Sequence, residues 1–245
     1  MFTAKQVVDD FFEEINSEEK AYLLGFFMAD GHLRSQLSNK KINHMMVSVA
    51  IKDLEVIENF KKFICPNATL QIFNTKTKYK GEYQNYEVCK VQWTSEKMGT
   101  TLNSKYKINS TKSVSCDLVF PEMKTEMIRH FIRGFMDGDG TVRKPKNSYP
   151  SLNFVCTSES FIKELEKHLL SGVGGSTYLV LDDKNRKTPI WRLYLFSYSK
   201  YNTPGNRELA KEVKENFYSN LYNYLYKDAT LYLTRKKEKF DKIPC

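Results

Sequence analysis

Apolar residues occupy positions 21–29 of the stretch AYLLGFFMADG without the polar gaps that a helix with one solvent-facing side shows. A helix that is apolar on every face is buried on every face, so this pattern predicts an enclosed helix that stops at Asp30-Gly31. The stretch HFIRGFMDGDG repeats the design 109 residues later, with Gly134 in place of Gly25 and Asp139 in place of Asp30. The chain therefore contains two versions of one unusual segment.

The residues after each segment repeat the same order of patterns. Val47, Val49 and Ile51 alternate with other residues as in a half-buried strand, and residues 52–64 are apolar at helical spacing. Each half therefore reads helix, hairpin, helix, hairpin, helix. The further elements that we expect are strands at 70–73 and 86–94 around a lysine-rich turn at 74–85, then a strand at 152–157, a helix at 159–170, and strands at 177–181 and 191–197 around a polar turn at 182–188.

The division of the chain follows from this repeat. We expect a first repeat over residues 1–104, a linker over 105–115 that overlaps the polar stretch 103–113, and a second repeat with a helical tail over 116–245. Pro121 suits the first turn of the helix that leads into the second motif. The tail is expected to be helical from Asn206 to Phe240. We interpret its basic run RKKEK as a solvated helix end in preference to a dedicated DNA contact.

Glycines stand at equivalent points in both segments. A glycine inside a helix costs about 0.5–1 kcal/mol relative to alanine, so Gly25 and Gly134 predict a close crossing of the two helices. Gly31 and Gly140 stand where a helix stops, and we expect them to adopt the left-handed conformation of a helix cap.

Asp30 and Asp139 are expected in the last helical turn, where the helix dipole is negative and an acid is unfavourable. Parallel helices packed side by side would bring the two carboxylates together, and Mg²⁺ prefers such oxygen ligands. A calcium loop beginning at Asp137 is excluded, because it requires glycine at its sixth and glutamate at its twelfth position, which are Val142 and Ser148. A helix-stop turn explains one Asp-Gly pair, but not two that share glycine, aromatic and acid positions.

Together, LLGFFMADG at 23–31 and IRGFMDGDG at 132–140 resemble the double signature of the LAGLIDADG homing endonucleases, in their single-chain, two-motif branch. The resemblance covers about residues 17–240. It implies an α+β fold of two pseudo-twofold-related αββαββα repeats, with the motif helices at the interface and antiparallel sheets forming a DNA-binding saddle. One departure is Met28, in a position that is acidic in the family name and that holds Asp137 in the second copy.

The resemblance also implies a function. It predicts a site-specific double-strand DNA endonuclease that hydrolyses phosphodiester bonds at a long pseudo-palindromic target. We expect Asp30 and Asp139, with Ala29 and Gly138 beside them, to bind Mg²⁺, for which Mn²⁺ or Ca²⁺ can substitute. Metal ions between acids and phosphate oxygens activate water and stabilise charge. An RNA-splicing maturase or a non-cleaving DNA-binding regulator on the same fold is the alternative.

Strand alternation supplies candidate cations. In VCKVQW and WRLYLF it places Lys90 and Arg192 outward at equivalent positions, where a cation can stabilise developing charge; contact with a non-scissile phosphate is an equal alternative. His32 follows the first motif, and we interpret it as structural in preference to a group near the phosphate. Two-stranded ribbons fit the major groove, and the DNA contacts that we expect are Arg34, Gln36, Lys76, Lys78, Lys80, Gln92, Arg143, Lys144, Lys146, Lys184, Arg186, Lys187 and Tyr194.

Composition agrees with this interpretation. The 245 residues carry a net charge of +9, which favours a polyanionic partner such as double-stranded DNA. The five scattered cysteines argue against a disulfide framework and a structural zinc site. No apolar stretch approaches the about 18 residues of a membrane span, and no signal peptide is evident. We expect a soluble, intracellular monomer without an obligate protein partner, in the cytoplasm of a bacterium or phage host or in an organelle matrix.

Overall fold

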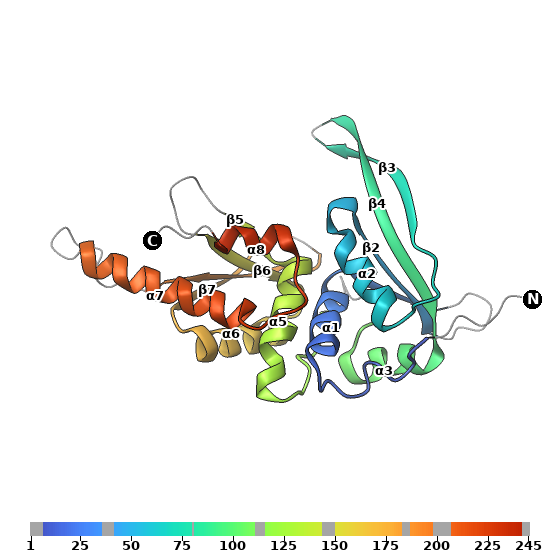
Figure 1. Ribbon diagram of the computed structural model, residues 1–245, viewed down its shortest axis with the longest axis horizontal. Helices are drawn as coiled ribbons and strands as arrows, with labels where there is room; N and C mark the ends of the chain where they lie inside the picture. The colour runs from blue at the N-terminus through green and yellow to red at the C-terminus, as the bar shows by residue number, and fades with distance from the viewer. Residues whose placement is uncertain are drawn as a thin grey trace, which may run out of the picture.

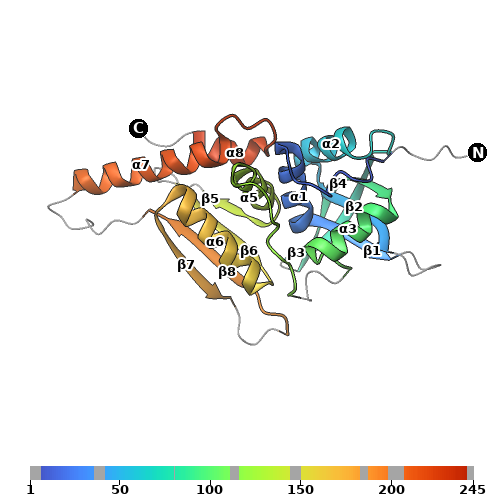
Figure 2. The ribbon, with the colours of Figure 1, turned by 90° about the horizontal axis from the view of Figure 1, so that it is seen from below.

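The computed structural model describes residues 7–35, 42–79, 81–110, 116–143, 150–182, 187–197 and 207–241. They form two lobes that meet along two central helices, α1 and α5 (Figure 1). Helices α2, α7 and α8 lie toward one side of the molecule, and strands β3, β7 and β8 lie toward the other (Figure 2).

The first lobe contains one four-stranded antiparallel sheet in the order β1-β2-β4-β3. Ser17 caps the first helix by accepting a hydrogen bond from the backbone of Lys20. The elements of this lobe are α1 (Glu18–Asp30), β1 (Gly31–Ser35), β2 (Ile42–Ala50), η1 (Ile51–Asp53), α2 (Leu54–Phe63), β3 (Gln71–Tyr79), β4 (Glu82–Thr94) and α3 (Glu96–Tyr106).

The second lobe repeats this arrangement with the sheet order β5-β6-β8-β7. Two further helices follow its sheet. The elements are α5 (Thr125–Asp139), β5 (Thr141–Arg143), β6 (Ser151–Cys156), α6 (Glu159–Val173), β7 (Ser176–Leu181), β8 (Trp191–Phe196), α7 (Arg207–Tyr226) and α8 (Thr234–Asp241). The predicted α+β fold of two repeated halves, with the motif helices between them, is confirmed.

The strand pairing identifies equivalent residues in the two repeats. Leu33 pairs with Met45, which pairs with Trp93. In the second lobe, Val142 pairs with Leu152, which pairs with Leu195. Trp93 and Leu195 are therefore equivalent, and so are Lys90 and Arg192, each three residues earlier in its strand.

The two motif helices pack as closely as the sequence predicts. Residues 21–29 of α1 are all buried. A Cβ atom on Gly25 would overlap the carbonyl oxygen of Phe131, and one on Gly134 would overlap that of Tyr22. The backbones thus touch at both glycines, which explains why no side chain is present there.

The prediction that Gly31 and Gly140 adopt a left-handed conformation is wrong. Gly31 has φ −70° and Gly140 has φ −79°, both extended conformations open to any residue. What these positions lack is space: a Cβ atom on Gly31 would overlap the Phe27 ring, and one on Gly140 would lie 2.5 Å from the carbonyl oxygen of Met136. The glycines therefore let each chain turn directly from a buried helix into a strand.

Four sequence expectations differ from the structure. The lysine-rich stretch 74–85 is a turn only near Gly81, because β3 and β4 pair along most of it in a ribbon that extends beyond the lobe (Figure 1). Pro121 lies in irregular chain before α5, which begins at Thr125. The tail is two helices, with a break between Tyr226 and Thr234. Helix α3 also extends to Tyr106, so the first residues of the expected linker are helical.

Aromatic side chains fill the core of each lobe. Phe60 stacks on Trp93 with ring centroids 5.9 Å apart, and Phe135 meets Phe161 at 4.8 Å. Within the described parts of the chain, no helix combines the length and apolar character that a bilayer crossing requires.

Candidate active site and nucleic-acid interface

Asp30 and Asp139 are the last residues of α1 and α5. Asp30 is partly buried and Asp139 is exposed. The two helix ends meet closely, because a Cβ atom at Gly138 would lie 3.4 Å from Oδ2 of Asp30 and would overlap the Cβ of Ala29. The structure therefore brings both predicted acids to the boundary between the lobes.

Each acid faces a cavity of its own. A cavity of about 280 Å³ is lined by Asp139, Met28, Ala29 and Thr157, among others. A cavity of about 220 Å³ on the other side is lined by Asp30 together with Ala29, His32, Leu33, Arg34, Asn109 and Ser110. Ala29 belongs to both linings and thus lies between two hollows that each contain one of the acids.

The donor set around the acids suits a hydrated cation better than a protein-enclosed one. Among the described residues there is no group of three or more His, Cys, Asp or Glu side chains placed to hold a metal ion. Mg²⁺ commonly keeps several waters and binds through one or two carboxylates plus phosphate oxygens. Asp30 and Asp139 with the adjoining backbone of Ala29 and Gly138 are compatible with that mode.

Asp137 has a structural environment. Its side chain is buried, and Oδ2 accepts hydrogen bonds from the Tyr22 hydroxyl at 2.9 Å and the Leu233 backbone at 2.8 Å. Burial raises the pKa of Asp137 to about 6, against the opposing effects of Lys236 and these two donors. The carboxylate thus joins α1, α5 and the chain before α8, and Met28 in the equivalent position of α1 is likewise buried.

A buried ion pair reinforces the same interface. Arg133 is fully buried and donates to Glu18 Oε1 at 2.6 Å, to the Leu225 carbonyl at 2.6 Å and to the Leu231 carbonyl at 2.7 Å. Its Nη2 also lies 2.9 Å from Nδ1 of His130. Since a buried charge requires partners for its hydrogen-bonding groups, this network holds α1, α5 and the end of α7 together.

Lys236 is the cation that the sequence interpretation missed. It is 4% exposed, and its ammonium donates to the carbonyl oxygens of Met136, Asp137 and Gly140. Burial lowers the pKa of Lys236 to about 8, and nearby carboxylates, Asp137 foremost and then Asp30, oppose that effect. The expectation of a solvated RKKEK run is therefore wrong at Lys236, its second residue, and the chain itself supplies positive charge at the end of α5.

Lys90 and Arg192 lie on the outer faces of their sheets, two strands from the motif residues. Neither lines the described acid cavities; Arg34 and His32 do so on the Asp30 side. Arg192 donates to Asp182 Oδ2 at 2.9 Å, which raises its pKa. Whether Lys90 and Arg192 act in catalysis stays a prediction, and so does the structural role expected for His32.

The outer face of the first sheet is electropositive. Burial, then Arg34 and then Lys90, lower the pKa of His44, which lies between these cations on the same face. Gln92 shares that face, opposite Met46. This surface is therefore suited to a polyanion.

The second sheet presents aromatic side chains on its outer face. Tyr194 and Tyr178 are exposed and stacked with ring centroids 6.3 Å apart. Arg143 projects from the same face of β5, and Lys187 is exposed before β8.

Lys76 and Lys78 project from the other side of their ribbon. Lys76 pairs with Asn85 and Lys78 with Tyr83. Lys90 pairs with Gln71, which is an odd number of residues from both lysines along β3. Lys76 and Lys78 therefore lie on the face opposite to Lys90, because strand parity separates them. The other predicted contacts, which are Gln36, Lys80, Lys144, Lys146, Lys184 and Arg186, lie outside the described residues.

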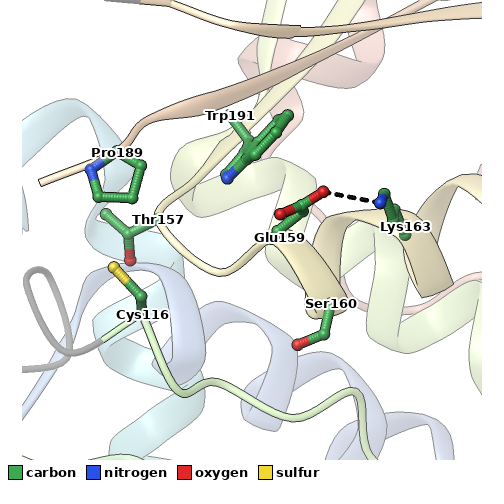
Figure 3. Close-up of a pocket in the computed structure, with 7 residues that line it drawn as sticks. All are labelled: Cys116, Thr157, Glu159, Ser160, Lys163, Pro189 and Trp191. Carbon is green, nitrogen blue, oxygen red and sulfur yellow. Dashed lines mark ion pairs between the residues drawn. The ribbon is translucent and has the colours of Figure 1, made fainter. Parts of the chain in front are cut away.

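A further surface hollow of about 560 Å³ lies in the second lobe, lined by Cys116, Thr157, Glu159, Ser160, Lys163, Pro189 and Trp191 (Figure 3). Its charged side chains pair with each other, Lys163 Nζ lying 2.7 Å from Glu159 Oε1. Neither motif acid lines this hollow.

Comparisons with known proteins agree with this geometry. Residues 126–217 match the family described as LAGLIDADG-like domain. The solved structure titled "The homing endonuclease I-WcaI bound to its DNA recognition sequence" is 16% identical to this chain, covers 94% of it and 91% of its own length, and has a TM-score of 0.52. The N-terminal LAGLIDADG domain of DUF199/WhiA is 14% identical, with 87% and 92% covered and a TM-score of 0.43. No curated protein matches.

Proposed function

We propose that this protein is a site-specific double-strand DNA endonuclease, because residues 126–217 match the LAGLIDADG-like domain family and the chain has the fold of the LAGLIDADG homing endonucleases. It hydrolyses one phosphodiester bond in each strand of a long target with approximate twofold symmetry. Two repeats in one chain supply both acids, so we propose that it acts as a monomer.

One observation carries this proposal. Asp30 and Asp139 end two helices whose backbones touch at Gly25 and Gly134, and each acid faces a separate cavity. An acid at a helix C-terminus is electrostatically unfavourable by about 0.3–1 kcal/mol. The presence of such an acid in both repeats is explained if each carboxylate has a function, such as metal binding, that outweighs this destabilisation.

The residues have distinct roles in the proposed reaction. Asp30 and Asp139 would hold hydrated Mg²⁺ beside the scissile phosphates, where the ion would supply an activated water and charge stabilisation. Arg34, which lines the Asp30 cavity, holds a phosphate oxygen on that side. Lys90 and Arg192, on the outer faces of the two sheets, stabilise negative charge that develops on the phosphates during cleavage.

The two sheets differ in length, and this bears on recognition. Strand β4 has 13 residues, whereas its counterpart β8 has six. At about 3.3 Å per residue, the first lobe reaches further along a groove than the described part of the second. We therefore propose that the half-site read by the first lobe is the longer one.

Selection from a randomised DNA library tests the proposal. Purified protein is incubated with supercoiled plasmids that carry a randomised duplex insert, in Mg²⁺ or in EDTA, and linearised molecules are ligated to adaptors and sequenced. A single consensus that is cut in Mg²⁺ alone supports the endonuclease. Random ends, or linear product in EDTA, would contradict it.

Binding without cleavage is the second candidate. It is favoured by the ion pair of Arg192 with Asp182, which engages one candidate cation within the protein, and by the small number of ligating side chains among the described residues. The same library distinguishes the two functions, because a regulator would retain a consensus on a filter and leave every plasmid supercoiled.

A further inference from the structure

The end of helix α5 requires hydrogen-bond donors. The last four carbonyl groups of a helix have no partner within it, and α5 has no basic residue in its last turn. Lys236 supplies the donors from α8: its Nζ lies 2.6 Å from the Met136 oxygen, 2.7 Å from that of Asp137 and 2.7 Å from that of Gly140. An ammonium group has three N–H bonds, so these contacts saturate it.

The chain on either side of Lys236 is fixed to the same helix end. The Leu233 backbone donates to Asp137 Oδ2 at 2.8 Å, and Lys239 Nζ donates to the Val142 carbonyl at 2.7 Å. The structure thus holds the residues before and after Asp139, although the Asp139 side chain itself is exposed.

The other side of this segment is attached to the first lobe. Thr234 donates through its backbone and its hydroxyl to Glu55, both at 2.8 Å. Arg235 pairs with the buried Asp53, with Nη2 and Oδ2 2.7 Å apart. Residues 227–241, which we name the C-terminal arm, therefore bridge the two lobes beside the end of α5 (Figures 1 and 2).

We propose that Lys236 is a positioning residue for Asp139, and that the C-terminal arm sets the position of this acid relative to the first lobe. The proposal rests on the nuclease function proposed above. Because the hydrogen bonds of Lys236 go to α5 and Gly140, and none goes to α1, its loss displaces Asp139 more than Asp30. The two strands of the target are then cut at unequal rates.

Strand-resolved kinetics test this proposal. A selected target duplex is labelled differently at the two 5′ ends, and single-turnover rates are measured for both strands with saturating enzyme. The Lys236→Met variant removes the donors at similar size, and Lys236→Gln keeps part of them. We expect Lys236→Met to slow one strand by up to about 100-fold, Lys236→Gln to slow it less, and both variants to change the dissociation constant little.

Lys237→Met is the matched control. This neighbouring lysine pairs with Asp241 at 3.1 Å and lies over the Tyr222 and Tyr232 rings, away from α5. Its loss should leave the ratio of the two strand rates unchanged. Equal slowing of both strands by Lys236→Met would overturn the proposal, because it would indicate general destabilisation or a charge effect shared by both acids.

Amide hydrogen exchange provides a readout that does not depend on cleavage. In Lys236→Met, exchange should increase in peptides that cover the α5 end and β5, including the Gly140 amide, which donates to Met136 at 2.9 Å. Peptides over the end of α1 should change less. If wild type cuts no DNA, the nuclease proposal fails while this experiment still decides the role of the arm; unchanged exchange at the α5 end would refute that role.

Discussion

Gly25 and Gly134 face each other where α1 and α5 cross, and neither position has room for a Cβ atom, because backbone carbonyl oxygens of the opposite helix occupy the space. The contact fixes the separation of the two helices along their length. It therefore also fixes the separation of the two acids at their ends.

Substitution at this crossing should destabilise the whole protein. Gly25→Leu or Gly134→Leu is expected to lower the free energy of unfolding by at least about 1–3 kcal/mol, because overpacking forces the helices apart. Denaturant unfolding measures the change. Gly81→Ala is the control, since a methyl group there meets nothing and only its φ of 91° is unfavourable. Unchanged stability in both leucine variants would show that the helices do not cross at these glycines.

The two acids should be separable from folding and binding. Asp30→Asn and Asp139→Asn each remove a charge with little change in volume, so we expect double-strand cleavage to be abolished while affinity and melting temperature are largely kept. Asp228→Asn is a suitable control, because Asp228 is exposed and its φ of 57° is one that asparagine also adopts. Normal linearisation of plasmid by either variant would remove that acid from the site.

Cations on the two faces of the first sheet should affect different steps. Lys78→Ala is expected to weaken binding and to reduce the log–log salt slope by about 0.9 per lost phosphate contact, while saturated cleavage remains near the wild-type rate. Lys90→Ala and Arg192→Ala should lower the cleavage rate more than affinity. Salt titrations and single-turnover rates decide between these effects. If Lys78→Ala slowed saturated cleavage as much as Lys90→Ala, the distinction between cations that affect DNA affinity and cations that affect the cleavage rate would be wrong.

His130 should make stability depend on pH. Burial, followed by the charge of Arg133, lowers its pKa to about 4, although Glu18 opposes this. The pKa of His130 is near 6.5 in the unfolded chain and about 4 in the folded chain. The contribution of the neutral side chain to the free energy of unfolding is therefore complete above pH 6.5. It is lost as the pH falls toward 4, by up to about 1.4 kcal/mol per pH unit. Arg129 and Glu19 also face this imidazole. His130→Gln should flatten the profile in that window, measured by urea unfolding at each pH, and an unchanged slope would exclude His130 as its cause.

The sequence predicted those features that depend on periodicity. The enclosed character of α1, the glycine crossing and the equivalence of Lys90 with Arg192 all follow from helical or alternating patterns, because burial repeats with the geometry of the element. The long β3–β4 ribbon was missed since both of its faces are exposed beyond the core, so that polar residues such as Thr75 and Lys76 alternate without an apolar signal.

The C-terminal arm was missed for another reason. The partners of Lys236 are backbone carbonyls about 100 residues away in the sequence. Every residue has a backbone carbonyl, so the sequence does not identify these partners. A signal was nevertheless present: Lys236 stands three residues after Leu233 and four before Phe240, both buried, so it lies on the apolar stripe of its helix. A lysine in such a position requires a specific partner.

The arm also orders events during synthesis. Lys236 is synthesised 100 residues after Met136, whose carbonyl oxygen it contacts at the end of α5. Arg235, beside it, pairs with Asp53, which is synthesised earlier still. Contacts between such distant parts of a chain form late in folding. We therefore expect the first lobe to be folded while the end of α5 still lacks the support of the C-terminal arm, so that the two motif acids reach their final arrangement only after residues 234–241 have been added.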